Sequence, residues 1–222
     1  MAKGSSKAPA VKGEYSQKRL DKALYIANGN YHEKLAQSEA AFGEEASKFY
    51  AEQSAEQKEA IQEYTGAYYS DMNRLLRDGN LNDSVFGHDK AYVENVTKKV
   101  KAMQEAISKH SLGKDVWLQR GTDSKEVAGL AKSIGKDTLD VGDTFVNKQF
   151  VSAGTAKGTG FDHGSVIMHI FAPKTAKGLY VDSFSKHKGE NETILAAGQR
   201  FKVKKRYKTD DGKWHFDLHI IP

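Results

Sequence analysis

The chain has 222 residues, of which 38% are hydrophobic and 28% are charged, and it contains no cysteine, which excludes disulfides, thiol catalysis and thiolate metal sites. Its net charge of +5 is concentrated at the start, where residues 1–30 carry six basic and two acidic side chains. The remainder is nearly neutral, which argues against a nucleic-acid-binding face on the folded part.

The organisation along the chain predicts a short tail followed by one domain. Residues 1–16 are rich in Gly, Ser, Lys and Ala and are expected to form a disordered basic tail. Residues 17–222 suit a single domain, mainly helical over 17–112 and mainly β over 113–222. No apolar run approaches the roughly 20 residues of a membrane span, and no signal peptide is recognisable. We therefore expect a soluble chain without a membrane span.

Helical spacing dominates the first half. Residues 17–52 are predicted to be helical, with interruptions near Gly29 and Gly43. A capping-box pattern begins at Ser54, and Gly79 is a suitable helix stop. Together with two later apolar repeats, these signals predict helices over residues 54–79, 93–113 and 123–135.

The second half carries short β-branched and aromatic runs between glycines. In the last run, Trp214, Phe216 and Leu218 alternate with polar residues, and the Asp211-Gly212 turn before it predicts a hairpin over 200–221. A helical half followed by a strand-rich half predicts an α+β fold. The other strand candidates are residues 115–119, 149–153, 165–171, 178–183, 192–196 and 200–207.

Three separated motifs can carry chemistry. Arg120 ends a predicted strand and is followed by Gly121, which suits bidentate binding of a phosphate or carboxylate as well as an ordinary salt bridge. Ser152 ends another strand and leads into a loop of small residues that a ligand could approach, or that could be a plain surface loop.

The third motif is the pair Glu190 and Glu192, one residue apart where a loop enters a predicted strand. Strand geometry would direct both carboxylates to the same side, about 6–7 Å apart. Two such carboxylates can stabilise an oxocarbenium-like centre and accept a proton. The alternative is a solvated loop, because Lys186 and Lys188 neutralise it locally.

Taken together and in this order, the motifs resemble those of mono-ADP-ribosyltransferase toxins of the Arg–Ser–Glu class. The similarity is to the clostridial Rho-modifying exoenzymes and to the enzymatic components of actin-modifying binary toxins, over about residues 55–222. It includes the helix KEAIQEYTGAYYSDMNRLLRDG and the aromatic-x-Ser motif at Phe150. The helix positions that match the family are Tyr64, Thr65, Asn73, Leu76 and Arg77.

The resemblance implies an N-terminal helical layer on two packed, mostly antiparallel sheets, with an NAD cleft between the two layers. It implies transfer of ADP-ribose from NAD to a protein side chain, a glycosyl transfer that releases nicotinamide. Glu192 would stabilise the ribose cation, Ser152 would orient Glu192, and Glu190 would deprotonate an arginine acceptor. The residues expected to hold NAD are Arg120, Gly121, Asn73, Arg77, Thr65, Phe161 and Ser152.

This chain departs from the family at two places. The family's Ser-Thr-Ser is Ser152-Ala153-Gly154, so only the first hydroxyl remains. Gly164 occupies the place of an arginine that helps the clostridial exoenzymes to grip NAD, and Arg77, Lys157 or His163 could compensate.

NAD is the expected substrate, and no metal is expected. His215 and His219 share a strand face but lie about 13 Å apart, too far for one ion. The expected partner is a target protein in a host or competitor cell, such as actin or a small GTPase, reached by a secreted or injected monomeric effector. Three alternatives remain open: an NAD glycohydrolase, a non-catalytic binding module of this fold, and a nucleic-acid-binding domain supported only by the basic 200–208 segment.

Overall fold

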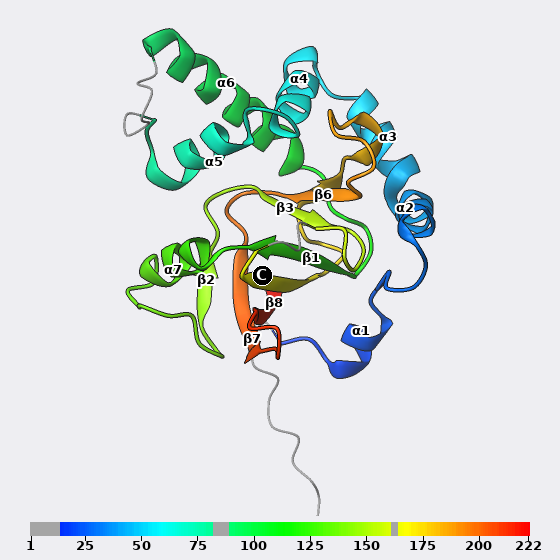
Figure 1. Cartoon of the computed structure of the whole chain (residues 1–222). Helices are drawn as coiled ribbons and strands as arrows, with labels where there is room; N and C mark the ends of the chain where they lie inside the picture. Colours follow the sequence, from blue (N-terminus) through cyan, green and yellow to red (C-terminus); the bar gives the residue numbers. More distant parts are fainter. Residues whose placement is uncertain (1–13, 82–88, 161–163) are drawn as a thin grey trace, which may run out of the picture.

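The computed structural model describes residues 14–81, 89–160 and 164–222, and most of its helices lie over one end of a central sheet, while the first and the last lie elsewhere along it (Figure 1). This architecture confirms the predicted α+β class. The helices are α1 (Gln17–Lys22), α2 (Tyr31–Ser38), α3 (Glu44–Ala51), α4 (Ala55–Tyr64), α5 (Tyr69–Asp78), α6 (Lys90–Ile107) and α7 (Ser124–Lys132), with a π-helical turn at Glu39–Gly43 and a 3₁₀ turn at Asp182–Phe184.

The capping signals place several helix ends correctly. The Ser54 hydroxyl accepts from the Gln57 amide while the Gln57 side chain accepts from the Ser54 amide, the two halves of a capping box. Gly79 ends α5 in the left-handed conformation, with φ +77°. The predicted 54–79 helix nevertheless breaks between α4 and α5.

The predicted interruption at Gly43 is wrong, because the chain passes through it from the π-helical turn directly into α3. Gly29 does interrupt the helical segment: its φ is +100°, and it lies in the non-helical stretch between α1 and α2. The predicted 93–113 helix is present as α6, which ends at Ile107 rather than near Gly113.

Within the described residues, eight strands pair in the order β2-β7-β8-β4-β1-β3-β6-β5 as one hydrogen-bonded sheet. All neighbours are antiparallel except β4 and β8, which are parallel. The expected division into two packed sheets is not confirmed, although β1 and β3 are joined through only one registered residue pair, Gln119 with Gly154. The strands are β1 (Val116–Thr122), β2 (Thr144–Val146), β3 (Val151–Gly154), β4 (Val166–Ala172), β5 (Gly178–Tyr180), β6 (Glu192–Leu195), β7 (Arg200–Lys208) and β8 (Trp214–Ile221).

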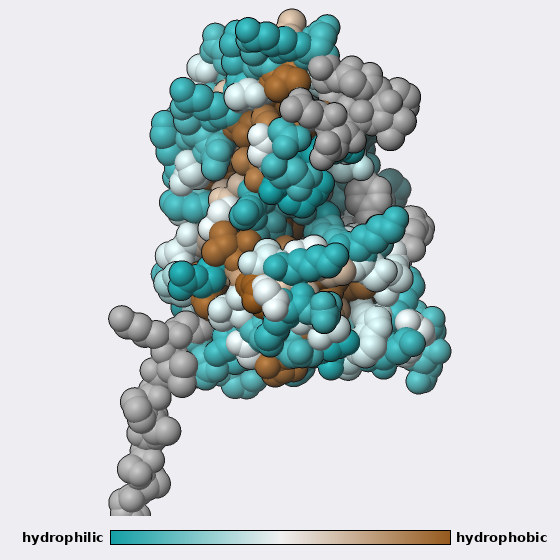
Figure 2. Space-filling view, turned by 90° about the vertical axis from the view of Figure 1, so that its left-hand side faces the viewer, coloured by the Kyte–Doolittle hydropathy of each residue, from teal (hydrophilic) through white to brown (hydrophobic). Residues whose placement is uncertain are grey.

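The hairpin predicted over 200–221 is confirmed as β7 and β8, with Gly212 in the turn at φ +83°. Strand β2 was not predicted; its three residues pair with β7 at one edge of the sheet. The face of the molecule in Figure 2 is mainly hydrophilic, and its apolar residues lie in separate patches. None of the helices in the described ranges combines the length and the apolar character needed to cross a membrane.

The helical part of the molecule contacts the strands that carry the predicted site residues. Tyr64, at the end of α4, is fully buried, and its ring meets the Phe150 ring edge-on with 5.4 Å between centroids. Its hydroxyl donates to the Phe150 carbonyl at 3.3 Å. Because Phe150 immediately precedes β3, this contact fixes the start of the strand that bears Ser152.

Candidate active site

A cavity of about 330 Å³ lies where α4 and α5 face the starts of β3 and β6. Its size is within the usual range for a small-molecule site. It gathers residues from both halves of the chain, including most of the predicted site. The lining residues are Tyr64, Thr65, Gly66, Tyr69, Asn73, Arg120, Gly121, Ser152, His187, Glu190 and Glu192.

Glu192 and Ser152 are brought together by the pairing of β6 with β3. Glu192 opens β6 opposite Gly154, and Ser152 lies two residues earlier on β3. The Ser152 hydroxyl donates a hydrogen bond to Glu192 Oε1. Glu192 is only 8% exposed, so the serine donates to a carboxylate that is largely shielded from solvent.

The environment of Glu192 opposes its ionisation. Burial raises its pKa to about 7, and the nearby Glu190 and Asp182 charges act in the same direction. The Ser152 hydrogen bond and the Arg120 charge act in the opposite direction. A carboxylate that titrates near neutral pH in a cavity is typical of a functional site.

Glu190 enters the same cavity, but by a different geometry from the predicted one. Strand β6 begins only at Glu192, and Asn191 is in the left-handed region with φ +57°. The alternation of an extended strand therefore does not apply between the two glutamates. The turn instead directs both side chains into the cavity wall.

Arg120 leaves β1 on the side of the cavity, where its side chain is 20% exposed. Its Nη2 donates to Glu126 Oε2 at 2.8 Å and its Nη1 to the Ser152 carbonyl at 2.8 Å. Although burial opposes it, the Arg120 charge lowers the pKa of Glu126, as does a hydrogen bond from Thr122. Glu126, which none of the sequence motifs identified as a site residue, is thus the carboxylate partner of this arginine.

Asn73 and Thr65 line the cavity while they also hold the protein together. The Asn73 amide donates to the Tyr64 hydroxyl at 3.0 Å and accepts from the Phe150 amide at 3.1 Å. The Thr65 hydroxyl donates to the Gln62 carbonyl and accepts from the Lys186 amide, at 2.8 and 2.9 Å. Both side chains therefore fix the walls of the site.

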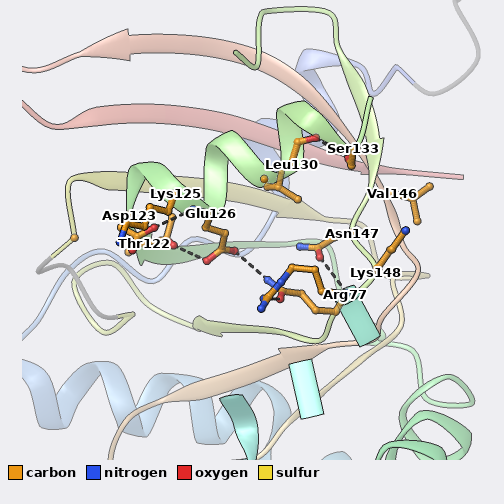
Figure 3. Close-up of a pocket in the computed structure, with 14 residues that line it drawn as sticks. Arg77, Thr122, Asp123, Lys125, Glu126, Leu130, Ser133, Val146, Asn147 and Lys148 are labelled. Atoms are coloured by element: carbon orange, nitrogen blue, oxygen red, sulfur yellow. Dashed lines mark hydrogen bonds between the residues drawn. The ribbon is translucent and has the colours of Figure 1, made fainter. Parts of the chain in front are cut away.

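A second cavity of about 910 Å³ adjoins the first at Gly121, and Figure 3 shows its lining side chains. Arg77 reaches it from α5 and donates to Gln149 Oε1 at 2.9 Å, and Gln149 donates in turn to Glu126 at 3.4 Å. Arg77 therefore lies in the neighbouring cavity rather than beside Glu192. Lys125 and Lys148 add positive charge to its lining.

The two glycines at which the chain departs from the family pattern, Gly154 and Gly164, are in close contact with neighbouring backbone. A Cβ at Gly154 would overlap the Gly160 backbone, so no serine fits there. A Cβ at Gly164 would overlap the Thr122 carbonyl, so no arginine side chain can leave this position without a backbone shift. The loop after β3 thus packs directly on β1 through glycines.

Of the two described residues that could replace the missing arginine, Arg77 lies at the adjoining cavities. Lys157 lines a separate cavity with Trp117 and His169. Phe161 and His163, predicted to cover the nicotinamide and to assist binding, lie outside the described residues.

Comparison with known proteins places this chain in a family. A family model of the ADP-ribosyltransferase exoenzyme matches residues 39–217. A curated relative, the NAD(+)--arginine ADP-ribosyltransferase EFV of Enterococcus faecalis, is 25% identical over 160 residues, which are 72% of this chain and 31% of that protein. The chain thus spans about a third of the length of this relative.

Solved structures share the fold. Plx2a, an ADP-ribosyltransferase toxin from Paenibacillus larvae, is 22% identical, with a TM-score of 0.68 over 85% of this chain and 96% of that one. C3stau2 from S. aureus, solved with NAD, is 18% identical, with a TM-score of 0.66 over 90% of this chain and 98% of that one.

Proposed function

Because the chain belongs to the ADP-ribosyltransferase exoenzyme family, we propose that it cleaves NAD and transfers the ADP-ribose to an arginine side chain of a target protein. The observation that carries this proposal is the buried Glu192 carboxylate, held by the Ser152 hydroxyl in a cavity that also contains Glu190 and Arg120. The predicted family resemblance is confirmed by the family match.

The proposed reaction exchanges one bond at the ribose carbon. The bond from this carbon to the nicotinamide nitrogen breaks, and nicotinamide leaves with the bonding pair as a neutral molecule. A guanidinium nitrogen of the acceptor forms the new bond and gives up one proton. The step is therefore a glycosyl transfer, and it requires a negative charge beside the ribose and a base beside the acceptor.

Glu192 suits the first requirement. Its carboxylate is preorganised by Ser152 and shielded from water, so its charge acts at short range on the positive charge that develops on the ribose. Its elevated pKa implies that it must lose its proton to act, because only the ionised form supplies this charge.

Glu190 suits the second requirement. It lines the same cavity as Glu192 but lies on the turn before β6, where it is only partly buried. A protonated guanidinium is a poor nucleophile, and a neighbouring carboxylate can bind it and accept its proton. The similarity to a relative that is named as arginine-directed supports this choice of acceptor.

The two adjoining cavities are large enough together for a dinucleotide, and basic side chains lie where its phosphates could be held. We assign the phosphates to Arg120 and Arg77, with Gly121 at the junction allowing close approach of the backbone. Arg120 already donates to Glu126, so phosphate binding by its guanidinium requires it to share or exchange that partner. Asn73, Thr65 and Phe161 complete the set of proposed binding residues.

We propose a secreted or injected effector that acts on a protein in the cytosol of a target cell, in keeping with the toxins of this family. An NAD glycohydrolase is the second candidate, because the first half of the reaction needs only Glu192 and water.

A paired assay separates the two candidates. One arm measures nicotinamide release from NAD alone, and the other measures transfer of labelled ADP-ribose to agmatine, a small guanidine. The wild-type protein should show both activities, and Glu190→Gln should lose transfer while keeping slow release. Release without any transfer by the wild type would favour the glycohydrolase, and absence of both would contradict the proposed function.

A further inference from the structure

Asp182 holds the turn that presents the two glutamates. It follows β5, in the 3₁₀ turn Asp182–Phe184, and is only 6% exposed. Its carboxylate accepts the Gly189 amide at 3.1 Å on both oxygens and the Asn191 amide at 2.6 Å. A carboxylate buried at this depth is thus satisfied by backbone donors rather than by a cation.

These two donors flank Glu190. Gly189 has φ +92° and Asn191 has φ +57°, so the chain bends on both sides of the glutamate. Asparagine adopts the left-handed conformation more readily than other residues except glycine, and a hydrogen bond to its backbone amide adds a constraint on this conformation. The Asp182 contact to Asn191 is short and buried, and it supplies this constraint immediately before Glu192.

We infer that Asp182 is a positioning residue that sets the placement of Glu190 relative to Glu192, so that one cavity presents a base to the acceptor and a charge to the ribose. This inference rests on the proposed function. Asp182 does not line the cavity, and it acts through the backbone of residues 189–191.

The outer part of the same turn is anchored independently. The Lys186 amide donates to the Thr65 hydroxyl at 2.9 Å, and the Lys186 ammonium is paired with Glu63. The turn therefore keeps two attachments to α4 and the segment following it when Asp182 is altered. A substitution at Asp182 should consequently displace residues 189–191 without releasing the whole turn.

Asp182 also contributes charge to the cavity. The groups that act on the Glu192 carboxyl are Ser152, Glu190, Arg120 and Asp182, and the negative charge of Asp182 opposes ionisation of Glu192. Removing this charge should lower the pKa of Glu192. A general loss of packing would not remove this charge, so it should not lower the pKa of Glu192 in the same way.

The test compares Asp182→Asn with Asp143→Asn. Asp143 also accepts a backbone amide, that of Asp140 at 2.8 Å, but it lies beside β2 and outside the proposed site. For both variants and the wild type, the experiment measures agmatine labelling, nicotinamide release and the pH profile of release, with thermal melting as a check of folding.

We expect Asp182→Asn to lose labelling by roughly 10–100-fold more than release, since a displacement of about 1 Å suffices for a loss of this size. The midpoint of the pH profile should move to lower pH, and Asp143→Asn should change neither quantity. If Asp182→Asn melts like Asp143→Asn and keeps the wild-type ratio and midpoint, the inference is overturned while the proposed function stands. If it unfolds, Asp182→Glu replaces it; this variant keeps the negative charge but changes the reach of the carboxylate, so only the ratio is expected to change, and an unchanged ratio would also overturn the inference. A wild type without either activity contradicts the proposed function itself, and the inference falls with it.

Discussion

Removal of the Ser152 hydroxyl should change the pH at which the protein works. In the folded protein, burial raises the pKa of Glu192 to about 7, and the Ser152 hydrogen bond acts against that rise. A hydrogen bond to a charged group is worth about 1.5–3 kcal/mol, which corresponds to about one to two pKa units. Ser152→Ala should therefore move the pKa of Glu192 upward by about that amount.

The consequence for activity follows from the sign of this shift. If release requires ionised Glu192, the wild-type rate should rise with pH through a midpoint near 7. An upward shift of one to two units leaves roughly 5–50-fold less ionised carboxylate at neutral pH. Nicotinamide release by Ser152→Ala should fall by this factor at pH 7 and recover toward the wild-type rate as pH rises.

The assay is the pH profile of nicotinamide release at saturating NAD, with Ser38→Ala as the control. Ser38 is also buried, and its hydroxyl donates to the Lys34 carbonyl at 3.1 Å, away from the cavity. A Ser152→Ala profile with the wild-type midpoint would refute the reasoning, whatever its overall rate. It would mean that the hydroxyl does not stabilise the ionised Glu192.

Three further variants test other parts of the site. Arg120→Lys keeps the positive charge but loses the planar guanidinium, so NAD affinity, measured by calorimetric titration, should weaken by about 1–3 kcal/mol. Unchanged affinity would mean that Arg120 has a purely structural role. Asn73→Ala leaves the buried Phe150 amide unpaired and should lower the free energy of unfolding in urea by about 1–3 kcal/mol, and an unaltered midpoint would contradict this. Glu190→Gln removes a like charge, so the pKa of Glu192 and the release profile should move to lower pH; a shift to higher pH would disprove the coupling.

Local signals predicted the parts of the fold that depend on local chemistry. Ser54 and Gly79 marked helix ends because capping and left-handed termination involve only near neighbours. Strand β2 has three residues, too few for an alternating pattern, and its pairing with β7 brings together distant segments. The joining of β3 to β1 depends equally on tertiary packing that no short window of sequence contains.

The sequence predicted which residues form the candidate site better than it predicted how they are arranged. Arg120, Ser152, Glu190 and Glu192 do meet in one cavity, but the motif did not reveal the left-handed turn between the glutamates. The partnership of Arg120 with Glu126 was also missed. The Glu126 backbone amide donates to Asp123 at the start of α7, whereas its side chain accepts from the arginine, a contact between distant elements that no local motif contains.

The role of the Glu192 charge is tested most directly by nicotinamide release from NAD by Glu192→Gln, which keeps the shape of the side chain and removes its charge. We expect turnover to fall by roughly 10²–10⁴-fold while NAD affinity, measured by calorimetric titration, is largely kept. Glu94→Gln, an exposed substitution on α6, should leave both quantities unchanged. Near-wild-type turnover by Glu192→Gln would contradict the assignment of this carboxylate to the cleavage of NAD.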